Sequence, residues 1–248
     1  MIFIKNKEEI MIMRRAGRML AEIVQFLKSK IKPNISTYQI DEYACQLMKD
    51  YGVIPAFKGY RGFPAHICTS VNAEVVHGIP NKELILKEGD LISIDIGIEY
   101  KGFYVDSAFT LSVGKIDRNK QRLIETTKEA LYEGIKKAKA GNLLSDISFA
   151  IQSYVESRGF SVVRDFTGHG IGKAIHEEPP VPNFGRPHRG PLLKEGMVLA
   201  IEPMVNMGGW EVEIMDNGWT AITKDRLPSA HFEHTVAITD KEAEILTK

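Results

Sequence analysis

The sequence contains few cysteines and no long apolar run. Only Cys45 and Cys68 occur among its 248 residues. Two thiols are too few for a disulfide framework or a thiolate zinc site, so we expect both to be reduced. No stretch reaches the roughly 18 apolar residues that a membrane span requires, and acidic residues occupy the positions where a signal peptide would be apolar. These absences predict a cytoplasmic protein without a membrane anchor.

The sequence also lacks an excess of charge of either sign. Lys and Arg total 32, and Asp and Glu also total 32. This balance provides no net field to attract nucleic acid or an anionic membrane, so we expect neither as a direct partner. The glycines of Gly168–Gly172 do not have the spacing of a dinucleotide-binding fingerprint, and no Gly-Xaa-Ser-Xaa-Gly elbow occurs. Nucleotide chemistry and acyl transfer through serine therefore have no support, and a small or neutral substrate is favoured.

What the sequence does contain is an internal repeat. Leu86–Gly89, followed by an apolar run to Asp95, matches Leu193–Gly196, followed by an apolar run to Glu202, at an offset of 107 positions. The same offset relates a helix, its glycine stop and the start of a strand in both halves, which favours internal duplication. We therefore expect a single catalytic domain, 1–248, with halves of about 1–114 and 115–248 and a site between them.

Periodicity predicts the secondary structure. Apolar residues at helical spacing predict amphipathic helices over 9–31 and 119–138, and capping or breaking residues bound two more over 36–52 and 145–159. Five prolines within 178–191 predict an irregular loop rather than a helix or a central strand. Short alternating runs predict strands, paired antiparallel because they follow one another closely, over about 66–76, 91–98, 103–112, 161–166, 197–205, 211–216, 219–223 and 232–239.

Four carboxylates lie on these apolar strands: Asp95, Asp106, Glu202 and Glu233. Each alone is more often structural, for example at a strand end or facing solvent. Together in an interior they could not stay ionised without cations. His169, in a glycine-rich segment that permits close backbone approach, adds an imidazole nitrogen. Oxygen-rich ligation with one imidazole favours a first-row divalent metal ion.

The ordered set of these five residues, together with His77 and His176, resembles the type I methionine aminopeptidases of the M24 metallopeptidase family. The likeness covers nearly the whole chain. Only 33 positions separate His169 from Glu202, which leaves no room for the insertion of the type II enzymes, and 248 residues do not hold the extra N-terminal domain of aminopeptidase P and prolidase. The chain therefore resembles a minimal, bacterial-style enzyme. The matching segments are Gly59–Pro64, Val76–Pro80, Gly168–Gly172, Ile201–Met204 and Phe232–Thr235.

The resemblance implies an α+β fold of the pita-bread type, with two pseudo-symmetric halves, a curved antiparallel sheet inside and helices outside. It implies two divalent metal ions (Mn, Fe, Co or Zn), with Asp106 and Glu233 bridging them, Asp95 chelating one, and His169 and Glu202 completing the other. The implied reaction removes the initiator methionine from nascent polypeptides, preferring a small second residue, by metal-activated hydroxide attack on the first peptide bond. Glu202 would take the proton of the water, His176 would stabilise the oxyanion and His77 would contact the scissile amide.

The resemblance also implies an apolar pocket for the methionine side chain, built from Phe57, Tyr60, Phe63, Cys68, Ile175 and Trp219. Members of the family often have a cysteine at the position of Phe57 and an aromatic residue at that of Ile175, so core packing is an equal alternative for these two. The remaining histidines, His66, His188, His231 and His234, match no ligand position, and we expect structural roles for them.

We expect a monomer that acts on nascent chains, including those at the ribosome. Two alternatives remain open: a non-catalytic binding protein on the same fold, and a peptidase of different specificity. The presence of all five ligand positions argues against the first.

Overall fold

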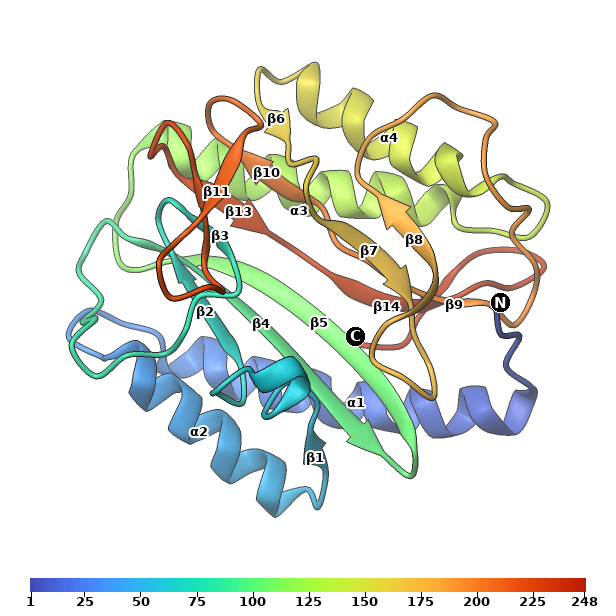
Figure 1. The fold of residues 1–248 in the computed structure, drawn as a ribbon, viewed down its shortest axis with the longest axis horizontal. Coiled ribbons are helices and arrows are strands. Elements are labelled where there is room, and N and C mark those ends of the chain that lie inside the picture. Colours follow the sequence, from blue (N-terminus) through green and yellow to red (C-terminus); the bar gives the residue numbers. More distant parts are fainter.

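The computed structural model describes residues 1–248 and has a curved layer of antiparallel strands with four α-helices packed outside it (Figure 1). In Figure 1, the two helices of the first half lie below this layer and the two of the second half lie above it. The helices are α1 (Lys7–Lys30), α2 (Thr37–Asp50), α3 (Arg118–Lys137) and α4 (Leu144–Glu156). Each lies within two or three residues of its predicted bounds, because buried apolar residues recur along one face at helical spacing.

Local side-chain chemistry sets where the first two helices begin. The Ser36 hydroxyl accepts a hydrogen bond from the backbone N–H of Gln39, and the Gln39 side chain accepts one from the backbone N–H of Ser36. Asn6 and Glu9 form the same reciprocal capping box at the start of α1. These caps satisfy amide donors that the helix itself leaves unpaired.

The strands form four antiparallel groups. Their orders are β1-β4-β2 with β5 beside β4, β13-β10-β6, β11-β12-β3, and β15-β14-β9-β7-β8. Every pairing is antiparallel, as predicted. A 3-10 turn, η1 (Tyr60–Gly62), precedes β2. The strands are β1 (Ile54–Pro55), β2 (Cys68–Val71), β3 (Glu74–Val76), β4 (Leu91–Tyr100), β5 (Phe103–Ser112), β6 (Ser161–Val162), β7 (Thr167–Gly170), β8 (Glu177–Pro182), β9 (Val198–Ile201), β10 (Met204–Asn206), β11 (Val212–Ile214), β12 (Ala221–Thr223), β13 (Ser229–His231), β14 (His234–Ala237) and β15 (Glu244–Ile245).

The offset of 107 positions recurs in the strand register. In the first half Ile54 pairs with Glu99, and in the second half Ser161 pairs with Asn206. Each residue of the second pair is 107 positions after its counterpart in the first (54 to 161, 99 to 206). The isolated bridges Ser36 to Ile85 and Leu143 to Leu192 are related in the same way. The two halves are therefore pseudo-symmetric in their hydrogen-bonded pairing as well as in sequence.

The halves meet where β5 approaches the start of β14. The backbone N–H of Glu233 donates to the carbonyl of Ala108 at 2.9 Å, and the backbone N–H of Asp106 donates to the hydroxyl of Thr235 at 2.9 Å. These bonds place Asp106 and Glu233, one from each half, at the centre of the curved layer.

Two predictions about strands were wrong. The segment predicted as an irregular loop over 178–191 begins with strand β8, because β8 lies at the edge of its sheet, where proline costs no ladder bond on the open side. The prediction of a continuous strand over 161–166 was also wrong: strand structure covers β6, stops, and resumes in β7, the segment that contains His169.

Two further predicted strands, 66–76 and 197–205, are each divided: the first becomes β2 and β3, which belong to different sheets. The strand over 197–205 is interrupted at Glu202-Pro203, and its two parts, β9 and β10, belong to different sheets. The short strand β13, just before the predicted 232–239, was not predicted. At Glu202-Pro203, between β9 and β10, proline has no backbone N–H to donate, so the hydrogen-bonded ladder cannot continue there.

Most buried apolar side chains form one continuous core between the helices and the curved layer. Both cysteines are free, as predicted. None of the four helices is long and apolar enough to cross a membrane.

Candidate metal centre

The first half contributes two carboxylates from adjacent strands. Asp95 on β4 pairs with Ala108 of β5, and Asp106 on β5 pairs with Gly97 of β4. A Cβ atom at Gly97 would lie 3.3 Å from Oδ1 of Asp106 and 3.0 Å from the Phe57 ring. The glycine therefore leaves room for the Asp106 carboxylate on the concave side of the sheet.

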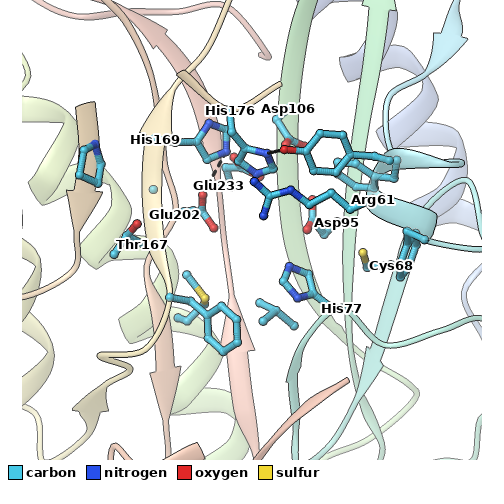
Figure 2. Close-up of a pocket in the computed structure, with 18 of the residues that line it drawn as sticks. Arg61, Cys68, His77, Asp95, Asp106, Thr167, His169, His176, Glu202 and Glu233 are labelled. Atoms are coloured by element: carbon cyan, nitrogen blue, oxygen red, sulfur yellow. Dashed lines mark hydrogen bonds and ion pairs between the residues drawn. The ribbon is translucent and has the colours of Figure 1, made fainter. Parts of the chain in front are cut away.

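The second half contributes Glu202, directly after β9, and Glu233, between β13 and β14. Both positions follow from ladder pairing: His234 pairs with Ile201, so the two glutamates flank this pair on neighbouring strands. Figure 2 shows carboxylates of both halves directed into one shared space, with His169 on the side of the second half.

His169 reaches this space from β7. Its ring Nδ1 lies 2.9 Å from the carbonyl oxygen of Gly170, a bond in which Nδ1–H donates, and Nε2 lies 3.4 Å from Oε1 of Glu202. The residue opposite His169 in the ladder is Ala200, whose small side chain leaves space for the imidazole. A Cβ atom at Gly170 would lie 2.2 Å from the carbonyl oxygen of Glu178, so only glycine permits this close approach of β7 and β8.

Three of the candidate ligands converge closely. One donor atom each of Asp106, His169 and Glu233 lies within 4.8 Å of the others, and all three residues are buried. Asp95 and Glu202 are not in this tight group, but both line the same cavity of about 660 Å³. Oδ1 of Asp95 and Oε1 of Glu233 are buried and have no hydrogen-bond partner.

Burial dominates the electrostatics of this group. It raises the pKa of Asp106 to about 7, against an opposing bond from the backbone N–H of Ser107. Burial and neighbouring carboxylates raise the pKa values of Asp95 and Glu233 well above their ordinary range, and burial with the charge of Asp106 does the same for Glu202. Burial also lowers the pKa of His169 to about 3, which keeps its imidazole neutral.

These observations fit a divalent metal centre. Several carboxylates are held close together, some of their oxygens have no partner, and the free nitrogen of a neutral imidazole faces them. A cation would offset the repulsion and the desolvation that raise the carboxyl pKa values. The donor set is rich in oxygen with one nitrogen, which suits a first-row divalent ion.

His77 and His176 line the cavity on either side of the carboxylates (Figure 2). The backbone of His77 has φ of 59°, in the left-handed region, and its ring packs edge-on against Phe166 and Trp219. His176 lies in the loop just before β8, where its Nδ1 is 2.9 Å from the Tyr60 hydroxyl. Desolvation in the cavity, with the charge of Arg61 nearby, lowers the pKa of His176 to about 4.

Five of the six residues expected to form the side-chain pocket line the cavity, namely Phe57, Tyr60, Phe63, Cys68 and Trp219. Ile175 does not. It is buried in the main apolar core, which is the alternative role considered for it from the sequence. Its position does not bring it to the cavity.

Several cavity residues were not identified from the sequence. Arg61 lies in the matched segment Gly59–Pro64, so that motif held a signal for it, and Figure 2 shows its side chain extending toward the carboxylates. Val76, Phe166 and Met204 extend the apolar wall. Phe166 closely precedes the His169 segment and Met204 closely follows Glu202, but no periodicity distinguishes either residue from ordinary core.

Sequence comparison shows which known proteins this chain is similar to. The model of the family described as Metallopeptidase family M24 matches residues 11–240. The chain is 52% identical over 247 residues to the methionine aminopeptidase of Clostridium acetobutylicum, covering 100% of this chain and 99% of that one. It is 52% identical over 248 residues to methionine aminopeptidase 1 of Bacillus subtilis, covering 100% of both.

Solved structures of methionine aminopeptidase and of prolidase superpose on this chain. The crystal structure of methionine aminopeptidase from Thermotoga maritima superposes with a TM-score of 0.99 at 46% identity, covering 100% of both chains. The prolidase from Pyrococcus furiosus superposes with a TM-score of 0.79 at 26% identity, covering 99% of this chain and 65% of that chain. The α+β fold with pseudo-symmetric halves is thus shared with both kinds of peptidase.

Proposed function

This chain belongs to metallopeptidase family M24, and from that premise we propose that it is a methionine aminopeptidase. It would remove the N-terminal initiator methionine from nascent polypeptides, preferring a small second residue. The observation that carries the proposal is the convergence of Asp106, His169 and Glu233 inside a cavity with an apolar wall. Relatives of the same length that carry this name support the substrate class.

Two divalent metal ions would be held by Asp95, Asp106, His169, Glu202 and Glu233, with Mn, Fe, Co and Zn as candidates. When bound, such ions supply Lewis-acid chemistry, lowering the pKa of a water molecule and polarising a carbonyl oxygen. The partnerless oxygens of Asp95 and Glu233 and the free Nε2 of His169 are the atoms available for them.

Side chains of this protein bind the substrate and transfer the protons. Phe57, Phe63 and Trp219 line the part of the cavity suited to an unbranched apolar side chain such as that of methionine. Glu202 takes the proton of the attacking water, a role typically worth about 10²–10⁴-fold in rate. Neutral His176 donates a hydrogen bond to the carbonyl oxygen as negative charge develops there. His77 contacts the scissile amide.

The whole of 1–248 would work as one catalytic domain with halves of about 1–114 and 115–248. Both halves supply candidate ligands, so neither is expected to act alone. A monomer acting in the cytoplasm on nascent chains, including those at the ribosome, fits this substrate class.

Release of free methionine from Met-Gly-Met-Met tests the proposal. Protein stripped of metal and then titrated anaerobically with Mn²⁺, Co²⁺, Fe²⁺ and Zn²⁺ should regain cleavage of the first bond only. Leu-Gly-Met-Met and Pro-Gly-Met-Met, which change the first residue, and Met-Leu-Met-Met, which has a large second residue, serve as specificity controls. Folded protein that cleaves none of these with any metal would contradict the proposal, and faster cleavage of a control would redirect it to another peptidase specificity.

A further inference from the structure

The carboxylate of Glu202 lies between two imidazole rings. Its Oε1 is 3.4 Å from Nε2 of His169, and its Oε2 is 3.7 Å from Nε2 of His231. The two histidines come from different strands, β7 and β13. Only His169 is a candidate ligand by sequence, and His231 matches no ligand position of the family motif.

His231 is an unusual buried group. Its side chain is 1% exposed, and neither ring nitrogen has a hydrogen-bond partner. A neutral imidazole carries one N–H donor and one acceptor nitrogen, and buried polar groups in folded proteins are almost always paired. The nearest carboxylate to this unsatisfied ring is Glu202.

The backbone holds His231 in this place. Its N–H donates to the hydroxyl oxygen of Thr110 at 2.8 Å, and the Thr110 hydroxyl donates to the carbonyl of His231 at 2.8 Å. The hydroxyl of Ser93, two positions before Asp95 on β4, extends this hydrogen-bond network with a 2.8 Å bond to the Thr110 hydroxyl. Side chains of the first half therefore hold the backbone of His231, from which its ring extends to within 3.7 Å of the Glu202 carboxylate.

We propose that His231 is a positioning residue for Glu202, with its Nε2–H donating to Oε2 of that carboxylate. The present separation of 3.7 Å is about half an ångström longer than an N–H···O hydrogen bond. A small rotation of the Glu202 side chain closes this gap. Oε2 is then anchored, and Oε1 is left on the His169 side for metal binding and proton transfer.

This inference rests on the proposed function, because it concerns how a ligating and proton-accepting carboxylate is oriented. Hydrogen bonds from behind a ligand hold it in one rotamer, and their removal typically costs about 10–100-fold in metal affinity or activity. The proposed bond from His231 would hold the Glu202 carboxylate in one rotamer in the same way.

Two substitutions test the proposal: His231→Leu, which removes the donor, and His231→Gln, whose carboxamide N–H₂ replaces it. The readouts are Mn²⁺ affinity of the metal-stripped protein by calorimetric titration and the melting temperature of the metal-free protein. His231→Leu should bind Mn²⁺ about 10–100-fold more weakly. Its metal-free melting temperature should change little, because leucine loses one hydrogen bond but also removes the unpaired Nδ1 of His231 from the interior. His231→Gln should recover affinity to within a few-fold of wild type.

His234→Leu is the matched control. His234 is partly buried, but its Nδ1 is paired with the Thr247 hydroxyl at 2.9 Å, so its loss should lower the melting temperature and leave Mn²⁺ affinity unchanged. Affinity of His231→Leu within twofold of wild type, or an equal loss in His231→Gln, would overturn the inference alone. Failure of the wild-type protein to bind any divalent ion would overturn the proposed function with it.

Discussion

The hydroxyl of Tyr60 and Nδ1 of His176 lie 2.9 Å apart, which joins the turn η1 of the first half to the loop before β8 in the second. The two rings are also in contact, with centroids 5.2 Å apart. With Tyr60 donating to Nδ1, the proton of the neutral imidazole resides on Nε2, the nitrogen left to donate to substrate.

Removal of this bond should slow the reaction without weakening metal binding. Tyr60→Phe keeps the ring and removes one hydroxyl, so kcat for Met-Gly-Met-Met should fall about two- to twelvefold, the equivalent of a bond worth about 0.5–1.5 kcal/mol. Steady-state kinetics and a metal titration measure the two effects. Tyr100→Phe, outside the cavity, is the control. Unchanged kcat in Tyr60→Phe would show that the tautomer of His176 does not depend on Tyr60.

Glu202→Gln should remove most activity while preserving the fold. The substitution conserves volume but eliminates a ligand oxygen and the proton acceptor, so kcat should fall by at least about 10²-fold. The fold should persist because burial disfavours the charged form of Glu202, and the amide carries no charge. Circular dichroism with peptide turnover separates the two effects, and near-normal turnover would refute the assigned role.

Asp106 should make the metal-free protein less stable as pH rises. Its pKa is about 7 in the folded state, above the ordinary 3.8, so the folded protein binds more protons than the unfolded chain between these values. The free energy of unfolding contributed by Asp106 is therefore highest below about pH 4 and declines until pH passes about 7. Asp106→Asn lacks this titration and also removes the charge that raises the pKa values of the neighbouring carboxyls, which adds to the effect in the same direction.

Denaturant unfolding of both proteins in chelator at several pH values measures this effect. The unfolding free energy of wild type minus that of Asp106→Asn should decrease as pH rises from 4 to 7. A difference that stays constant across this range would contradict the raised pKa.

A buried ion pair holds the loop that carries His176. Nζ of Lys5 lies 2.6 Å from Oε2 of Glu177, and both side chains are almost fully buried. Oε1 of Glu177 accepts backbone bonds from Lys173 and Ala174. The segment before α1 thereby fixes the turn next to the cavity.

Lys5→Met should destabilise the protein by about 3 kcal/mol, because removing one partner leaves a buried carboxylate unpaired. It should also reduce kcat, since His176 is the neighbour of Glu177. Lys7→Met, at the exposed start of α1, is the control and should change neither quantity. Thermal unfolding with kinetics measures both, and wild-type stability in Lys5→Met would show that the pair contributes little.

Local sequence patterns were sufficient to predict the helices and the two longest strands. The helices and the two ten-residue strands β4 and β5 have strong periodicity, and their positions agree with prediction. The short strands β7 and β8 are rich in glycine and proline, and only pairing with β9 and with each other makes them strands. Tertiary hydrogen bonding overrides weak local preference in such segments.

The residues of the candidate site also divide into those that the sequence identified and those that only the structure placed. The residue types and order of Asp95, Asp106, His169, Glu202 and Glu233 are evident in the sequence, and the cavity brings them together. The sequence left open whether Ile175 lines the pocket or packs in the core, and it held no sign that His231 reaches Glu202, because both depend on how segments distant in sequence pack in the folded chain.

The sequence by itself determined the duplicated plan, the helices, the chemistry of the candidate ligands and the family. Each of these depends on spacing along one chain or on residue type, which needs no partner to be recognised. The tertiary structure alone decided which donor atoms converge within 4.8 Å, which carboxyl pKa values burial raises, and how Tyr60 and His231 contact the site. Distance, desolvation and hydrogen bonding arise between residues far apart in the chain, so they exist only once the two halves have closed on each other.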